Sequence, residues 1–213
     1  MENIITLENV SKKYKDRTIL ENMNFSFEKG KCYGIVGRNG SGKSVLLKLI
    51  VGFAYPDSGN ITIRGKQLKK DIDFVDDAGV IINSPEFING MSGLNNLLYL
   101  ADIRKKTNKE RIIEVLRNLD LEGAMKKRVS TYSQGMKQRL RLAQAIMEEP
   151  ELLILDEPMN ALDDDAVREI REMLLSLKNE GKTIILTSHN SEDIDLLCDS
   201  VCEIGKGKLE KIR

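Results

Sequence analysis

The sequence predicts an α/β fold that combines a mostly parallel sheet with an antiparallel β layer and an inserted helical subdomain. Three observations predict it. Strand-like alternation dominates residues 3–65, helical spacing without a convincing strand runs from about 89 to 145, and two apolar strands flank an amphipathic helix between 151 and 188. No repeat or linker divides the chain, so we expect a single domain over 1–213.

Length, charge and cysteine content exclude several classes of protein. The 213 residues include 33 basic and 33 acidic side chains, so no basic excess indicates a nucleic-acid partner and we expect none. The chain has neither a signal peptide nor a run of about 18 apolar residues, which predicts a cytoplasmic protein. Cys32, Cys198 and Cys202 lack metal-ligand spacing and are expected to be packed thiols.

The first 88 residues are expected to form most of the β structure. Strands are predicted in the segments NIITLENVSKKY, TILENMNFSFEKG, CYGIVG and GNITIRG, and their alternation favours an antiparallel layer beside the core sheet. KSVLLKLIVG, residues 43–52, predicts a short helix that ends at Gly52. AGVIIN, residues 78–83, predicts a further apolar strand.

The middle and the end of the chain alternate between helices and strands. LNNLLYLADI, KERIIEVLRNLDL and MKQRLRLAQAIM have helical spacing, which assigns about 89–145 to the subdomain and 1–88 with 146–213 to the core. ELLILDEP and KTIILTS predict two buried strands, and the helix between them repeats Val167, Ile170, Leu174 and Leu177 at core spacing. Strands that are apolar on both faces indicate a parallel sheet covered by helices.

GIVGRNGSGKS has the pattern G-x-x-x-x-G-K-S between a predicted strand and a predicted helix. Glycines allow a tight loop whose backbone N–H groups turn toward phosphate, and the helix N-terminus adds partial positive charge. Lys43 is placed to reach the terminal phosphates, and Ser44 to ligate magnesium. This pattern predicts a P-loop NTPase core that binds a nucleoside triphosphate. The expected nucleotide-binding residues are Gly37, Arg38, Asn39, Gly40, Ser41, Gly42, Lys43, Ser44 and Val45.

Two carboxylates follow the apolar strand of LLILDEP. In an open α/β sheet, ligands bind at the carboxyl ends of the strands. Asp156 is therefore expected to hold magnesium, and Glu157 to act as the general base that polarises an attacking water.

YSQGMKQRLRLAQAI, shortly before LLILDEP and followed by NALDDD and TSHN, resembles the ATP-binding subunit of an ABC transporter over essentially the whole chain. The resemblance implies ATP and Mg²⁺ as cofactors and an ATPase that closes as a head-to-tail dimer. It also implies a separate transmembrane permease subunit, which would hold the chain at the inner face of the membrane. The implied residues are Ser133, Gln134 and Gly135 of the signature motif, Asp163 of the D-loop formed by 160–163, the switch histidine His189, and Tyr14, which would stack on adenine.

This chain departs from the family pattern at two places. Its signature motif, YSQGM instead of LSGGQ, is similar to that of exporters for antimicrobial peptides and drugs. Asn83 occupies the position of the Q-loop glutamine, where it is a shorter amide ligand for magnesium. The segment after Asn83, residues 84–101, would receive the membrane subunit, although its Phe87 and Met91 suit the subdomain core equally well.

Three residues have simpler interpretations. His189, the chain's one histidine, could merely close a strand, but beside the strand of Asp156 and Glu157 its imidazole would meet the γ-phosphate. Ser133 could merely cap a helix, and Asp163 likewise.

The leading hypothesis is an ATP-hydrolysing exporter subunit in a homodimer or a heterodimer. The alternatives are a soluble ABC ATPase in a non-transport process and a binding module without turnover. The presence of both Glu157 and His189 disfavours the binding module.

Overall fold

A computed structural model of the chain describes residues 2–83 and 86–213. Its centre is a six-stranded sheet with the strand order β10-β9-β3-β8-β7-β6, in which β10 runs antiparallel to β9 and the other pairs are parallel. The strands are β3 (Cys32–Val36), β6 (Ala78–Ile81), β7 (Leu152–Asp156), β8 (Thr183–Thr187), β9 (Ser200–Gly205) and β10 (Lys208–Lys211). The predicted parallel core is confirmed.

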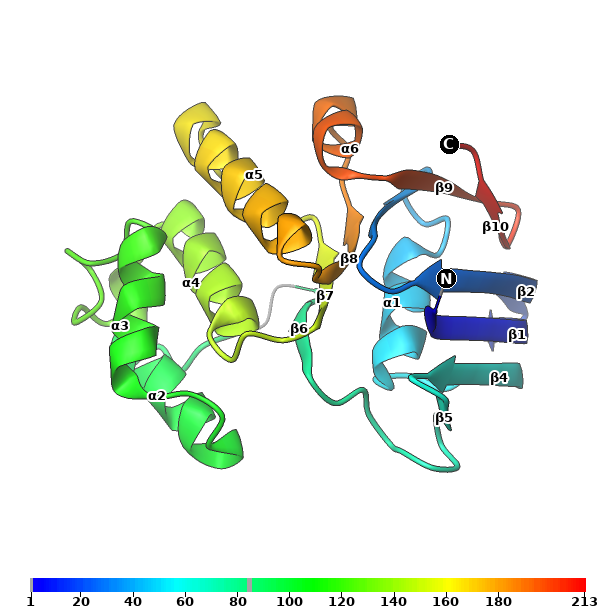
Figure 1. Ribbon diagram of the computed structural model, residues 1–213, viewed down its shortest axis with the longest axis horizontal. Helices are drawn as coiled ribbons and strands as arrows, with labels where there is room; N and C mark the ends of the chain where they lie inside the picture. Colours follow the sequence, from blue (N-terminus) through cyan, green and yellow to red (C-terminus); the bar gives the residue numbers. More distant parts are fainter. Residues whose placement is uncertain (1, 84–85) are drawn as a thin grey trace.

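The antiparallel β layer is a separate four-stranded sheet, with the order β2-β1-β4-β5. Its strands are β1 (Asn3–Tyr14), β2 (Arg17–Glu28), β4 (Ser58–Ile63) and β5 (Lys66–Gln67). Helix α1 (Lys43–Val51) shares a buried cluster with both sheets, which includes Ile5 of β1, Ile35 of β3 and Leu46 of α1. Figure 1 shows α1 next to the antiparallel strands at one end of the molecule.

The helices of the middle segment lie at the opposite end of the molecule from the antiparallel sheet (Figure 1). They are α2 (Gly93–Arg104), α3 (Lys109–Asn118) and α4 (Gln134–Ile146), with a 3₁₀ turn at Val129–Thr131. Ser92, Asn108 and Ser133 cap the three helices, each accepting a hydrogen bond from a backbone N–H of the first turn. The predicted helical character of this segment is confirmed.

The last two helices lie between the last three parallel strands in chain order, and both pack against the sheet. In α5 (Asp164–Asn179) the predicted core positions Ile170 and Leu174 are buried, while Val167 and Leu177 are partly buried. Helix α6 (Ser191–Leu197) ends next to Cys198, whose Sγ lies 3.9 Å from that of Cys32. All three cysteines are buried and free, as expected. The helices of the described ranges are too short or too polar to cross a bilayer.

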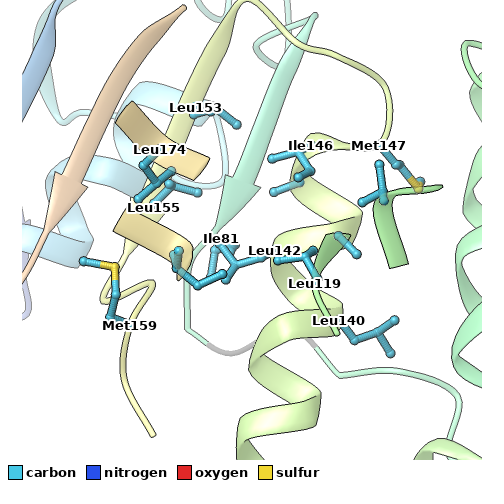
Figure 2. Packing of buried hydrophobic residues seen from close by; sticks show 14 of the residues in the cluster. Ile81, Leu119, Leu140, Leu142, Ile146, Met147, Leu153, Leu155, Met159 and Leu174 are labelled. Atoms are coloured by element: carbon cyan, nitrogen blue, oxygen red, sulfur yellow. The ribbon is translucent and has the colours of Figure 1, made fainter. Parts of the chain in front are cut away.

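One hydrophobic cluster joins the helical segment to the sheet. Figure 2 shows Ile81 of β6, Leu142 and Ile146 of α4, and Leu153 and Leu155 of β7 packed against one another. The close approach of β6 and α4 depends on Gly79, because a Cβ at this position would overlap the carbonyl oxygen of Ala145. A backbone oxygen in a helix has little freedom to move aside.

We therefore expect Gly79→Ala to lower the free energy of unfolding by about 3 kcal/mol through overpacking. Urea unfolding monitored by circular dichroism measures this difference. Gly123→Ala is the matched control, because a Cβ at Gly123 meets nothing within 4 Å. Equal stability of the two variants would show that β6 and α4 separate at little cost.

Candidate nucleotide-binding site

The loop between β3 and α1 has a backbone that only glycine adopts readily. Gly37, Gly40 and Gly42 have φ angles of 146°, 76° and 110°. A Cβ at Gly37 would also lie 2.7 Å from the carbonyl oxygen of Ile204, whereas Gly40 borders open space. The loop therefore keeps its backbone exposed at Gly40, where a ligand can approach it closely.

The Lys43 side chain folds back over this loop. Its Nζ donates to the carbonyl oxygen of Gly37 at 2.7 Å and to that of Arg38 at 3.4 Å, and the residue is almost fully buried. The ammonium group is thus fixed at the loop, close to the start of α1. A lysine held in this way places a positive charge where the loop would carry phosphates.

Hydrogen bonds join the ends of β7 and β8 to the start of α1. Ser44 Oγ donates to Asp156 Oδ2 at 2.7 Å, and Thr187 Oγ1 donates to Asp156 Oδ1 at 2.8 Å. The Glu157 backbone N–H in turn donates to Thr187 Oγ1 at 2.9 Å. Both carboxylate oxygens of Asp156 are therefore oriented, one of them toward Ser44.

Glu157 and His189 face one another across the end of the sheet. His189 Nε2 lies 3.1 Å from Glu157 Oε1, and the side chains are 58% and 25% exposed. Burial raises the pKa of the Glu157 carboxyl above its ordinary value, the nearby His189 opposes this shift, and the Asp156 charge adds to it. A carboxylate with a raised pKa is a better proton acceptor than an exposed glutamate.

A cavity of about 400 Å³ brings half of the predicted site residues together. Its lining consists of Asn39, Gly40, Gly42, Lys43, Ser44, Val45, Asp156, Glu157 and His189, together with Arg17 and Ile19 of β2. Arg17 and Ile19 were not predicted from the sequence. They reach the cavity because the antiparallel sheet packs against the core, and no motif marks them.

Tyr14 lies beside the cavity wall and is not part of its lining. It is the last residue of β1, pairs with Arg17 in the β1–β2 register, and is about half exposed. Lys12 Nζ lies 5.3 Å from the centre of its ring.

The residues of this cavity fit a magnesium nucleotide. Ser41 Oγ is buried without a hydrogen-bond partner, and no side chain caps the start of α1 at Gly42. Donors at a helix N-terminus suit phosphate oxygens. The Ser44 hydroxyl and the Asp156 carboxylate are the oxygen ligands that Mg²⁺ prefers.

Asn83 is exposed two residues after the end of β6, with a φ of 54°, and does not line the cavity. Ser84 and Pro85, which begin the predicted docking segment, lie outside the described residues. Phe87 of that segment is partly buried against the main hydrophobic cluster, so it serves the core. Met91 is partly buried as well.

The signature residues lie apart from the nucleotide cavity of their own chain. Ser133 Oγ accepts from the Met136 backbone N–H at 3.1 Å, as the capping interpretation predicts. A Cβ at Gly135 would lie 3.3 Å from the carbonyl oxygen of Ala161, so α4 begins against the 160–163 segment. Gln134 lines a separate cavity of about 190 Å³.

Asp163 caps α5, with its Oδ1 accepting from the Ala166 backbone N–H at 2.9 Å. This geometry agrees with the simpler capping interpretation of the residue.

Gln138 connects α4 to the residues that follow β7, and the sequence interpretation missed it. Its Nε2 donates to the carbonyl oxygens of Pro158 at 2.8 Å and Glu157 at 3.3 Å, and the residue is buried. The available signal was its spacing. Gln138 occupies the same helix face as Leu142 and Ala145, where a polar side chain needs a partner.

This phosphate loop, the acid pair at the end of β7 and the helix capped by Ser133 define an ATP-binding cassette. The family model described as "ABC transporter" matches residues 20–160, and the chain belongs to that family. It is an ABC ATPase, which binds and hydrolyses ATP.

The relatives and solved structures agree. The chain is 44% identical to the uncharacterized ABC transporter ATP-binding protein YybJ of Bacillus subtilis, over 97% of this chain and 95% of the relative. It is 39% identical to the bacitracin transport ATP-binding protein BcrA of Enterococcus faecalis, over 98% and 68%. It is 35% identical to the lantibiotic transport ATP-binding protein SrtF of Streptococcus pyogenes, over 97% and 89%.

Two solved structures of the cassette MJ0796 have the same fold. The dimeric structure of this bacterial ABC transporter cassette has a TM-score of 0.87 and 26% identity, covering 98% of this chain and 99% of that one. Its dimeric post-hydrolysis state bound to ADP and Pi has a TM-score of 0.84 and 25% identity, over 98% and 99%.

The raised pKa of Glu157 makes the stability of the protein depend on pH. The native state favours the protonated carboxyl, so this contribution is fully present below the unfolded-state pKa of about 4.3 and is lost as pH rises through the native pKa. Glu157→Gln is neutral at every pH. We therefore expect this variant to be more stable than wild type at neutral pH, with a difference that shrinks to zero on acidification.

Urea unfolding of the nucleotide-free protein between pH 4 and 8 tests this. Glu210→Gln, at an exposed position of β10, controls for the loss of one negative charge. A stability difference that stays constant with pH would contradict the assigned cause.

Proposed function

We propose that the chain is the ATP-hydrolysing subunit of an ABC exporter, which dimerises around two ATP–Mg²⁺ and drives a separate membrane subunit. The observation that carries this proposal is the convergence of Lys43, Ser44, Asp156, Glu157 and His189 on one cavity. The phosphate loop binds the triphosphate, and Ser44 and Asp156 hold the metal. Asn83, which lies outside the cavity in the single chain, reaches the metal only through water or only in the closed dimer. Bound magnesium supplies positive charge that neutralises the phosphate oxygens.

The residues around Glu157 support hydrolysis. Glu157 accepts a proton from the water that attacks the γ-phosphorus, and ADP departs as the bond from that phosphorus to the β-phosphate oxygen breaks. His189 hydrogen-bonds the γ-phosphate and orients the water. In its pairing with Glu157, His189 thus serves as the switch that responds to the γ-phosphate.

The arrangement of the signature motif supports a dimer. Ser133 and Gly135 stand at the start of α4, outside the cavity that holds Lys43. In a head-to-tail pair, Ser133, Gln134 and Gly135 of one chain, with Asp163 nearby, close the cavity of the other. The dimeric cassette MJ0796 supports this assembly. Tyr14, beside the cavity wall, then stacks on the adenine ring.

An apolar groove on the surface supports the proposal of a membrane partner. This groove, of about 340 Å³, lies between α1, β6, α2 and α4, and the exposed side chains of Phe53, Phe74 and Ile103 line it. A monomeric protein rarely exposes clustered large apolar residues without a partner. We assign the groove to the membrane subunit, which would keep the chain on the cytoplasmic face of the membrane. The names of BcrA and SrtF, for bacitracin and lantibiotic transport, favour export of a peptide antibiotic.

Two variants separate chemistry from binding. Glu157→Gln removes the base and is expected to lower phosphate release by about a hundredfold or more while ATP holds the chain in a stable dimer. Lys43→Ala instead removes the loop's positive charge and is expected to weaken ATP affinity at least tenfold. Steady-state phosphate release, fluorescent-ATP titration and size-exclusion chromatography measure these effects. Near-normal turnover of Glu157→Gln would remove that residue from its role.

A charge in the groove should separate the chain from its membrane partner. We expect Phe53→Asp to lose copurification with a membrane protein from native membranes, while ATP hydrolysis by the isolated chain is unchanged. Ile212→Asp is the control, since Ile212 is equally exposed but lies near the C-terminus, outside the groove. Recovery of wild type without any membrane protein would count against transport and in favour of a soluble ATPase.

A further inference from the structure

A buried ion pair joins α5 to α6 behind the catalytic residues. Arg171 Nε and Nη2 donate to Asp193 Oδ1 at 2.8 and 2.6 Å, and the two side chains are 10% and 3% exposed. Arg171 Nη2 also donates to Glu192 Oε2 at 3.0 Å. A charge pair at this depth needs every donor and acceptor satisfied, because an unpaired buried charge is strongly destabilising.

The second oxygen of Asp193 reaches the loop that carries His189. Ser188 Oγ donates to Asp193 Oδ2 at 2.6 Å and accepts from the Asn190 backbone N–H at 3.0 Å. Asp193 therefore fixes the residue before His189 directly and the residue after it through the same hydroxyl. The His189 side chain itself is more than half exposed, so packing around its ring restrains its conformation only weakly.

We propose that Asp193, anchored by Arg171, is a positioning residue that holds the His189 loop at the end of β8 through Ser188. The inference rests on the proposed role of His189 in hydrolysis. Arg171 and Asp193 touch no reacting atom. They set the direction from which the imidazole faces Glu157, at the 3.1 Å separation seen between the two side chains.

Both oxygens of Asp193 accept hydrogen bonds, which explains why this position holds a carboxylate. The carboxylate accepts from Arg171 with one oxygen and from Ser188 with the other. Hydrogen bonds to a charged acceptor are about twice as strong as neutral ones. An amide at this position would keep the shape but turn one acceptor into a donor, which would face either the guanidinium or the hydroxyl.

The experiment compares Ser188→Ala and Asp193→Asn with wild type in three measurements. We expect hydrolysis at saturating ATP to fall about 10- to 100-fold, as small misplacements of catalytic groups do, while ATP affinity changes less than about twofold. His189 is the chain's one histidine. Its imidazole NMR signals, read at a single pH, are therefore expected to move toward the values of the unfolded chain in both variants.

Asp195→Asn is the matched control. Asp195 lies on the same helix as Asp193 and pairs with Arg213, at an exposed position away from His189. We expect wild-type rate and an unmoved imidazole signal in this variant. Ser188→Ala leaves the Arg171–Asp193 pair intact, so the test survives if Asp193→Asn does not fold.

A third variant, His189→Ala, separates this inference from the proposed function. We expect Ser188→Ala to cost no further rate when it is added to His189→Ala. The positioning role is overturned if His189→Ala is impaired but Ser188→Ala hydrolyses ATP normally, or if the rate falls while the imidazole signal stays in place. A wild-type rate for His189→Ala would instead refute the proposed role of the histidine, and the positioning role with it.

Discussion

The parallel pairing of β7 with β8 places Asp156 directly opposite Thr187, and the nucleotide site is built on that register. Both strands end at this pair, so the polar residues that follow emerge at one edge of a sheet whose preceding residues are buried. A slip of one residue would turn Asp156 to the other face of the sheet and break its bonds to Ser44 and Thr187. Burial of the apolar residues of both strands sets their register, and this register positions the polar side chains of the site.

Thr187 and Ser188, two adjacent hydroxyl residues at the end of β8, have different hydrogen-bond partners. Thr187 supports Asp156 and the backbone of Glu157, whereas Ser188 faces the opposite way and meets Asp193. His189 follows both. Because Arg171 belongs to α5, which begins directly after the 160–163 segment, the histidine loop is tied to the helix that this segment leads into.

Patterns within short stretches of the sequence predicted the helices and strands. The residues that were missed depend on packing between segments that are distant in the chain. The phosphate loop, the strand that ends in Asp156 and the helix that ends at Gly52 each follow from spacing and turn chemistry within about ten residues. Gln138 was missed because the two carbonyl oxygens that it binds lie 19 and 20 positions later in the chain. Arg17 was missed because it belongs to one sheet and the cavity that it lines is formed mostly by residues around the other. Gly79 likewise shows its importance only when α4 packs on β6. The proposed roles of the signature residues involve a second chain, and that of Tyr14 involves a bound nucleotide, so neither depends on contacts within a single chain.

The hydrogen bond that caps α4 determines which part of the Ser133 hydroxyl is left for a ligand. One lone pair of Ser133 Oγ is engaged by the Met136 N–H, so the helix, and not an incoming molecule, takes up that acceptor capacity. The hydroxyl hydrogen is not used by this cap, and it lies beside main-chain N–H groups of the first helical turn that have no acceptor within the helix. The surface that α4 presents is thus rich in hydrogen-bond donors, which selects for an electron-rich group such as a phosphate oxygen and repels an ammonium group.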